Sequence, residues 1–91
     1  MKRDIVWTSQ FKKDYKLAQK RGLNIERLDD CIRALAKGES LPQSYRDHNL
    51  TGNWAGYREC HVAPDWLLVY RLEGGDLILV LARTGSHSDL F

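Results

Sequence analysis

The sequence predicts an α+β domain in which an N-terminal strand and an antiparallel helix pair precede a three-stranded antiparallel meander. Two observations favour this fold. Apolar residues recur at helical spacing up to residue 37 and at strand spacing from residue 57 onward. Glycine follows each helical stretch, and a Gly-Gly pair separates the last two strand-like stretches. The 91 residues suffice for one domain, so residues 1–91 are expected to form a single unit with both helices on one face of the sheet.

The first half of the chain predicts a short strand over residues 5–7 and then the two helices. Thr8 or Ser9 caps the first helix, because a side-chain oxygen there accepts from the first free backbone amides. Gly22 follows the end of this helix, and Asn24 caps the second, which ends near residue 37. The apolar stripe of the first helix is Phe11, Tyr15 and Ala18. The apolar stripe of the second helix is Ile25, Leu28, Ile32 and Leu35.

After a loop with little periodicity, the second half predicts three strands, over residues 57–62, 66–72 and 77–83. The last two are apolar on both faces, which is typical of central strands. The Gly-Gly pair between them predicts a two-residue hairpin loop, because glycine supplies the positive φ angles that such a loop requires. This hairpin pairs Leu72 with Leu77. The same register places Trp66 opposite Arg83 and brings the C-terminal tail to the start of the 66–72 strand.

The three histidines lie outside the helical stretches. The predicted register brings His87, in the tail, toward the end of the sheet that carries Asp65 and His61. His48 lies in the preceding loop. Strict alternation along the strand places His61 on the same face as Trp66, so either a bulge rotates His61 outward or it sits at the rim of that face. The sequence leaves these two orientations open.

Such a cluster has the groups needed to cleave RNA. Histidine takes up and releases protons near neutral pH, and RNA carries its own nucleophile in the ribose 2′-hydroxyl. Cleavage then needs a base for that hydroxyl, an acid for the leaving 5′-oxygen and positive charge for the transition state. The candidates are His48, His61, Asp65 and His87 for proton transfer, with Arg58 and Arg83 for the charge. The alternative is that each histidine is an ordinary surface or capping residue.

No metal or other cofactor is expected. Three histidines and a carboxylate resemble hydrolytic zinc ligation in type, but no pair has tight spacing such as His-x-x-x-His. Cys31 and Cys60 lack metal-ligand or redox spacing, so we expect buried thiols in a reducing cytosol. The sequence contains no signal-peptide pattern and no apolar run approaching the roughly 20 residues of a membrane span, so a cytoplasmic protein without a membrane partner is expected.

Two further features are candidate RNA contacts. Lys12, Lys16 and Lys20 recur four residues apart on the first helix. We call them the lysine stripe. It is either a solvated face or a set of phosphate contacts. Phe91, the last residue, either stacks on a base or docks the tail on the core. The side chains of Trp54 and Trp66 are more typical of core or loop packing than of base stacking.

Three segments also resemble a known family: KDYKLAQKRG, DHNLTGNWAGYRECHVAPDWLLVY and RTGSHSDLF. Across essentially the whole chain, the sequence resembles the RelE superfamily of bacterial toxin–antitoxin systems, most closely its YafQ-like branch. The resemblance implies an mRNA interferase that cleaves translated mRNA in the ribosomal A site. It also implies a cognate antitoxin, expected to be acidic and partly disordered, with the free toxin a monomer and the complex a hetero-oligomer.

The same resemblance implies an active site. The positions that line it are His48, His61, Asp65, Trp66, His87 and Phe91. Trp66 thereby joins Phe91, the two arginines and the lysine stripe as an expected RNA contact. Phe91 stands where RelE has a tyrosine and has no proton to give. Glu59 stands where the branch usually has an aspartate, and no role is carried over to it.

Two alternative functions follow from the same fold class. A ParE-like protein would inhibit DNA gyrase without a nuclease site, but the histidine set and the terminal phenylalanine argue against it. A plain RNA-binding module would bind without cleaving. The codon preference and the division of acid and base roles among the histidines do not follow from the sequence.

Overall fold

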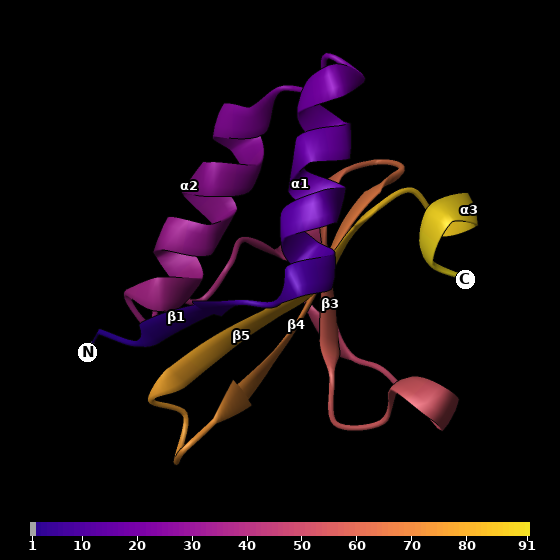
Figure 1. Cartoon of the computed structure of the whole chain (residues 1–91). Coiled ribbons are helices and arrows are strands. Elements are labelled where there is room, and N and C mark those ends of the chain that lie inside the picture. Colours follow the sequence, from indigo (N-terminus) through magenta and orange to yellow (C-terminus); the bar gives the residue numbers. More distant parts are fainter. Residues whose placement is uncertain (1) are drawn as a thin grey trace.

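A computed structural model describes residues 2–91 of the chain and confirms the α+β fold (Figure 1). Its strands are β1 (Asp4–Trp7), β2 (His48–Asn49), β3 (Arg58–Ala63), β4 (Trp66–Glu73) and β5 (Ile78–Gly85). Its helices are α1 (Ser9–Lys20), α2 (Ile25–Ala36) and α3 (His87–Leu90), with single 3₁₀ turns η1 (Gln43–Tyr45) and η2 (Gly52–Trp54).

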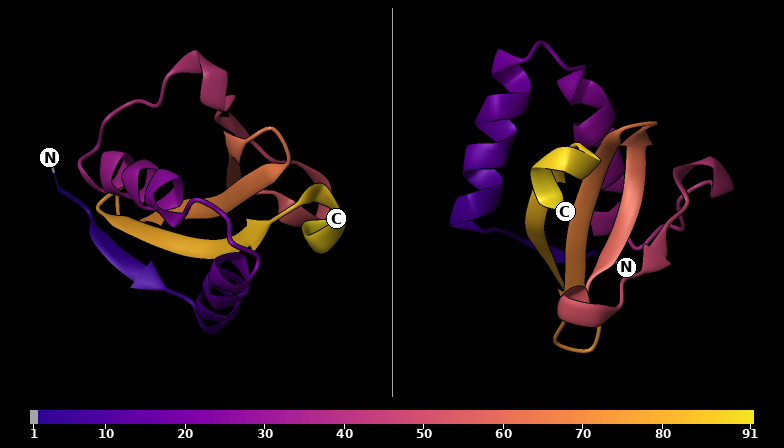
Figure 2. Two further views of the ribbon diagram at one scale, coloured as in Figure 1. Left: turned by 90° about the horizontal axis from the view of Figure 1, so that it is seen from above. Right: turned by 90° about the vertical axis from the view of Figure 1, so that its right-hand side faces the viewer.

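The strands form one five-stranded mixed sheet in the order β1-β5-β4-β3-β2. The predicted meander of β3, β4 and β5 is confirmed, with β4 at its centre. Two features were not predicted: β1 pairs in parallel with β5, and the two-residue β2 pairs with β3. The sheet is therefore mixed rather than purely antiparallel. Figure 2 shows β1 and the loop that carries η1 at opposite edges of the sheet.

The helix pair forms as its capping residues predict. The Thr8 hydroxyl accepts from the Phe11 amide at 3.1 Å, and Gly22 takes a φ of 73° just beyond α1. Asn24 occupies the N-cap position of α2, although its side chain makes no capping hydrogen bond. Both helices bury their apolar stripes against the same side of the strands. They cover one face of the sheet and leave the other face open for a site.

The predicted two-residue hairpin between β4 and β5 is wrong. Leu72 pairs with Leu79, so the loop is longer than predicted. The reason is conformational: Gly74, Gly75 and also Asp76 take positive φ angles, and the third such residue extends the turn. A bulge after Val69 shifts the register again. The expected Leu72–Leu77 and Trp66–Arg83 pairs are therefore wrong, and Arg83 lies opposite Val69.

The core has two parts, one on each face of the sheet. On the helix-covered face, α1 and α2 pack on β3, β4 and β5. Cys31 and Cys60 lie in this part as buried free thiols with their Sγ atoms 3.4 Å apart. Their hydrogen bond and burial raise the pKa of Cys60. On the open face, Leu90 of α3 packs against Leu67 and Val69 of β4. In the described part of the chain, no helix has the length and apolarity to cross a membrane.

Candidate active site

A β-bulge in β3 determines where His61 points. His61 pairs with Leu67 and Ala63 pairs with Trp66, so Val62 is the extra residue between them. Without the bulge, alternation would place His61 on the helix-covered face. With it, His61 lies on the open face beside Leu67, and 18% of its side chain is exposed. The orientation that the sequence left open is thus the rotated one.

Glu59 lies two residues before His61 on the same open face of β3. Its side chain is only 7% exposed, and its Oε1 lies 3.6 Å from His48 Nε2 and 3.7 Å from His61 Nε2. His48 faces it because β2 pairs His48 with Glu59. The Glu59 carboxylate therefore lies within ion-pair distance of both imidazoles. Sequence analysis assigned Glu59 no role, although the i, i+2 spacing with His61 indicates a shared strand face.

His87 enters the cluster from the tail. One carboxylate oxygen of Asp65, Oδ1, accepts from the His87 backbone amide at 3.1 Å and lies 2.7 Å from Nδ1. A carboxylate only accepts, so Nδ1 carries the proton and Nε2 is left to act on a ligand. The side-chain bond from His87, with the backbone bond second, lowers the pKa of Asp65. The predicted approach of His87 to Asp65 is confirmed.

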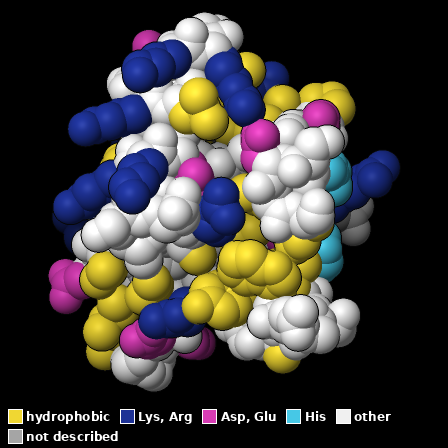
Figure 3. Space-filling view, turned by 45° about the vertical axis from the view of Figure 1, so that its right-hand side comes forward, with side chains coloured by type: hydrophobic (Ala, Val, Ile, Leu, Met, Phe, Trp, Pro, Cys, Tyr) yellow, Lys and Arg dark blue, Asp and Glu magenta, His cyan; other side chains and the backbone are white. Residues whose placement is uncertain are grey.

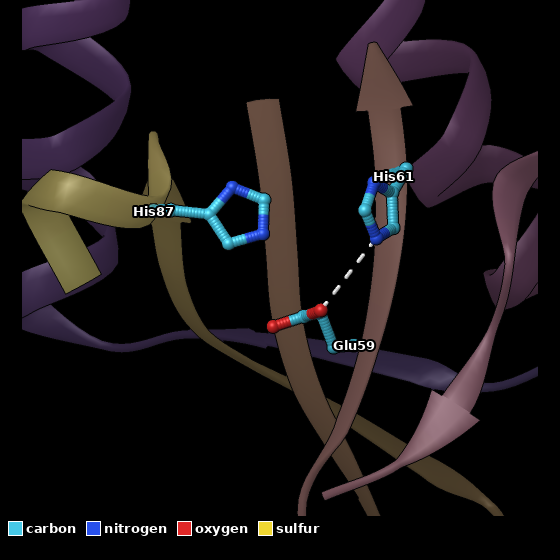
Figure 4. Close-up of side chains that lie close together, drawn as sticks. All are labelled: Glu59, His61 and His87. Carbon is cyan, nitrogen blue, oxygen red and sulfur yellow. Dashed lines mark ion pairs between the residues drawn. The ribbon is translucent and has the colours of Figure 1, made fainter. Parts of the chain in front are cut away.

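The imidazoles of His61 and His87 are 5.9 Å apart between ring centroids and are tilted by 57°. Figure 4 shows His87 reaching from α3 toward His61 on β3, with the Glu59 carboxylate at one end of the space between them. The ligand atoms of Glu59, His61 and His87 all lie within 4.8 Å of one another. Two imidazoles and a carboxylate at this spacing suit proton transfer, and they also suit a transition-metal ion.

The tail that carries His87 is itself held in place. Ser86 and Asp89 form a capping box at the start of α3. The guanidinium of Arg21, the C-cap residue of α1, donates to both oxygens of Asp89, at 2.7 and 3.2 Å, and this interaction is the main cause of the lowered pKa of Asp89. A Cβ at Gly85 would lie 3.0 Å from Asp89, so this close approach requires glycine. The helix pair thereby fixes the position of a residue on the open face.

Three of the expected RNA contacts, Trp66, Arg83 and Arg58, make contacts within the protein. Trp66 is 4% exposed and donates from Nε1 to the Thr84 hydroxyl at 2.9 Å, so no face of its ring is open to a base. The Arg83 guanidinium bonds to the buried Asp14 of α1 at 2.8 Å. The bonding partners of Arg58 are Asp47, Asn49 and Tyr70. Trp66 is thus buried and both arginines lie in internal ion pairs, and RNA contacts at these three positions stay predictions.

The remaining RNA candidates stay accessible. Phe91 is 58% exposed, and its ring meets Trp54 edge-on with the centroids 6.0 Å apart. The lysine stripe is exposed on α1, on the helix-covered side of the sheet, while the histidines lie on the open side. Figure 3 shows Lys and Arg side chains gathered over the helices, with the histidines at another edge of the same view. The stripe therefore does not line the histidine cluster.

The fold is that of bacterial toxins of type II toxin–antitoxin systems. Within that class the chain belongs to the YafQ family, whose description as "bacterial toxin of type II toxin-antitoxin system, YafQ" matches residues 3–91. The chain is similar to the mRNA interferase toxin YafQ of Escherichia coli K12, with 45% identity over 92 residues, covering 100% of this chain and 98% of that protein.

Solved structures agree. The chain is similar to YafQ in the crystal structure of the E. coli DinJ-YafQ toxin-antitoxin complex, with a TM-score of 0.90, 44% identity, and coverage of 100% and 99% of the two chains. It is also similar to a metal-bound toxin from Helicobacter pylori, with a TM-score of 0.90, 40% identity and full coverage of both chains.

Proposed function

We propose that this chain is an mRNA interferase, an endoribonuclease toxin that cuts translated mRNA in the ribosomal A site. The observation that carries the proposal is the grouping of three histidines and two carboxylates on the open face of the sheet. The YafQ relatives named as mRNA interferase toxins support it. A ParE-like inhibitor of gyrase would have no use for such a proton-transfer cluster.

His87 is the proposed general acid. Its Nδ1 proton is held by Asp65, so the opposite nitrogen, Nε2, can deliver a proton to the leaving 5′-oxygen. His61 is the proposed base for the ribose 2′-hydroxyl, since it lies across the space from His87. Glu59 Oε1 lies 3.7 Å from His61 Nε2 and 3.6 Å from His48 Nε2, so its carboxylate can hold both rings in position. Exposed Phe91 stacks on a base of the mRNA.

The experiment is single-turnover cleavage of a defined mRNA on programmed ribosomes. Attack by the 2′-oxygen leaves a 2′,3′-cyclic phosphate or a 3′-phosphate on the 5′ fragment, so a 3′-hydroxyl there would contradict the mechanism. No metal-bound water is needed. Cleavage is therefore expected to survive a zinc-selective chelator while magnesium keeps the ribosomes intact. Loss of cleavage on chelation would instead assign a metal to Glu59, His61 and His87.

A cognate antitoxin is the proposed second partner, as in the E. coli DinJ-YafQ complex. The net charge of +2 and the open histidine face favour an acidic, partly disordered segment that folds over the site. The free toxin is proposed to be a monomer acting on cytoplasmic ribosomes. Induction in growing cells tests the class of target: cut mRNA supports the proposal, whereas intact mRNA with gyrase–DNA breaks supports the ParE-like alternative.

A further inference from the structure

A cavity of about 310 Å³ opens beside His61, on the side away from the N-terminal strand. Its wall comes from three segments: α2 with Arg27, the η1 loop with Tyr45 and Arg46, and the end of β3 with His61. No acidic residue lines it. The cavity thus combines two arginines, an aromatic ring and a proposed catalytic histidine, and none of the roles given above uses it.

Arg27 lines this cavity and binds the bulge that orients His61. Its Nε and Nη2 donate to the Val62 carbonyl at 3.1 and 2.8 Å, and Val62 is the extra residue of the bulge. Its third nitrogen, Nη1, makes no hydrogen bond within residues 2–91. The bulge at Val62, bound by Arg27, therefore underlies both the cavity wall and the rotation of His61 to the open face.

Arg46 is the second cation on the wall, and its backbone is unusual. Its φ of 50° lies in the left-handed region, which is uncommon for residues other than glycine and concentrates at functional sites. This conformation presents the Arg46 carbonyl to His48 Nδ1 at 2.5 Å. Its guanidinium is exposed and forms no ion pair or hydrogen bond within the described chain. The Arg46 carbonyl thus binds His48 of the histidine cluster, while the Arg46 guanidinium stays available to a ligand.

We propose that this cavity is a nucleotide subsite for the mRNA, next to the phosphate that is cut. Arg46 binds a neighbouring phosphate, Arg27 Nη1 adds a second donor, and the Tyr45 ring packs against the base. Single-stranded RNA is the ligand class that fits, because it offers a backbone charge and an unstacked base at one site. The proposal rests on the proposed nuclease function and adds the residues that position the substrate on the far side of His61 from His87.

The test uses single-turnover cleavage on programmed ribosomes at increasing toxin concentration. Arg46→Gln removes one charge-assisted phosphate contact and is expected to raise the half-saturating concentration about tenfold, with the saturated rate unchanged. The salt dependence of binding should also fall, by a slope of about 0.7 for one single-strand phosphate. Arg46→Lys keeps the charge and should recover most of the affinity. Arg33→Gln, a matched exposed arginine of α2 paired only with Asp30, should leave both quantities at wild-type values.

Binding without cutting gives a second measurement. In a His87→Gln background, ribosomes carrying a 2′-O-methylated A-site codon should lose affinity on Arg46→Gln, and ribosomes with an empty A site should not. Equal losses on both ribosomes would overturn the proposal and place Arg46 on ribosomal RNA. Unchanged affinity on both would also overturn it. If the wild-type protein does not cut mRNA at all, the proposed nuclease function is refuted. If it cuts mRNA but Arg46→Gln has no effect, only the nucleotide subsite is refuted.

Discussion

Removing the carboxylate of Asp14 is predicted to be one of the most destabilising single changes in this protein. Asp14 is 8% exposed and accepts from Arg83 at 2.8 Å, from the Thr84 amide at 3.2 Å and from Gln10 at 3.0 Å. It joins α1 to the end of β5, immediately before the tail that carries His87. The prediction therefore concerns both stability and the position of the proposed acid.

The magnitude follows from what Asp14→Ala leaves behind. Breaking a buried ion pair by removing one partner costs about 3–5 kcal/mol. The Arg83 side chain is 26% exposed, so water recovers part of its solvation, and we expect about 2–3 kcal/mol. Arg83→Met should cost less, about 1–2 kcal/mol, because Asp14 keeps two hydrogen-bond donors. A domain of this size has only about 5–15 kcal/mol of stability in total.

Urea unfolding of the wild type, both single variants and the double variant measures the coupling between Asp14 and Arg83. The double variant should be more stable than the sum of the single effects predicts, by about 1–2 kcal/mol. Additivity within about 0.5 kcal/mol would refute the structural role of the pair. Arg83 would then again be available to RNA, and Arg83→Met should lower the salt dependence of ribosome binding instead of the stability.

Four further predictions concern function and pH. His87→Ala should lower the saturated cutting rate by about 10²–10⁴-fold with ribosome binding unchanged. A wild-type rate would show that His87 is not the acid and that another histidine has this role. Phe91→Ala should lose about 1–3 kcal/mol of binding, whereas Phe91→Tyr should retain most of it. Reversing the lysine stripe to glutamate should weaken ribosome binding and its salt dependence, and an unchanged salt slope would make the stripe an ordinary solvated face. Because Arg21 lowers the pKa of Asp89, docking of α3 is fully stabilised above the ordinary carboxyl pKa of about 4, and this stabilisation is lost progressively as the pH falls from there through the lowered pKa of Asp89. NMR of the Leu90 methyl groups should show this release, and Arg21→Gln should weaken its pH dependence, with the hydrogen bonds from Ser86 accounting for the rest.

The sequence predicted those parts of the fold that depend on neighbouring residues. The Thr8 cap and the helix periodicity are local signals, and both helices form as expected. The hairpin register was predicted wrongly because a third residue with positive φ, Asp76, is not a glycine and gives no signal of its own. The parallel pairing of β1 with β5 joins segments more than 70 residues apart, which local periodicity cannot indicate.

The candidate site was also predictable only in part. The approach of His87 to Asp65 follows from the order of the strands and survived the register error, because the tail leaves β5 at the same end of the sheet in either register. The face of the sheet on which His61 lies depends on a bulge in β3, and Arg27 of α2 binds that bulge. A sequence pattern within β3 does not show this contact. The spacing of Glu59 and His61 along β3 indicates their shared face, but the approach of His48 to Glu59 depends on β2, a two-residue strand with no periodicity to detect.

The two faces of the sheet differ in what they can bind. The helices cover one face, so an RNA strand can reach His61 and His87 only from the open face. The lysine stripe lies on the covered side and cannot hold the same nucleotides. If it contacts phosphates, they belong to another part of the target, such as ribosomal RNA. Arg58 is held by Asp47 and Arg71 by Glu73, which leaves Arg46, beside His61, as a cation available to the mRNA. Under the proposed nuclease function, this division favours dependence on the ribosome, because the open face offers few charges of its own to position the mRNA.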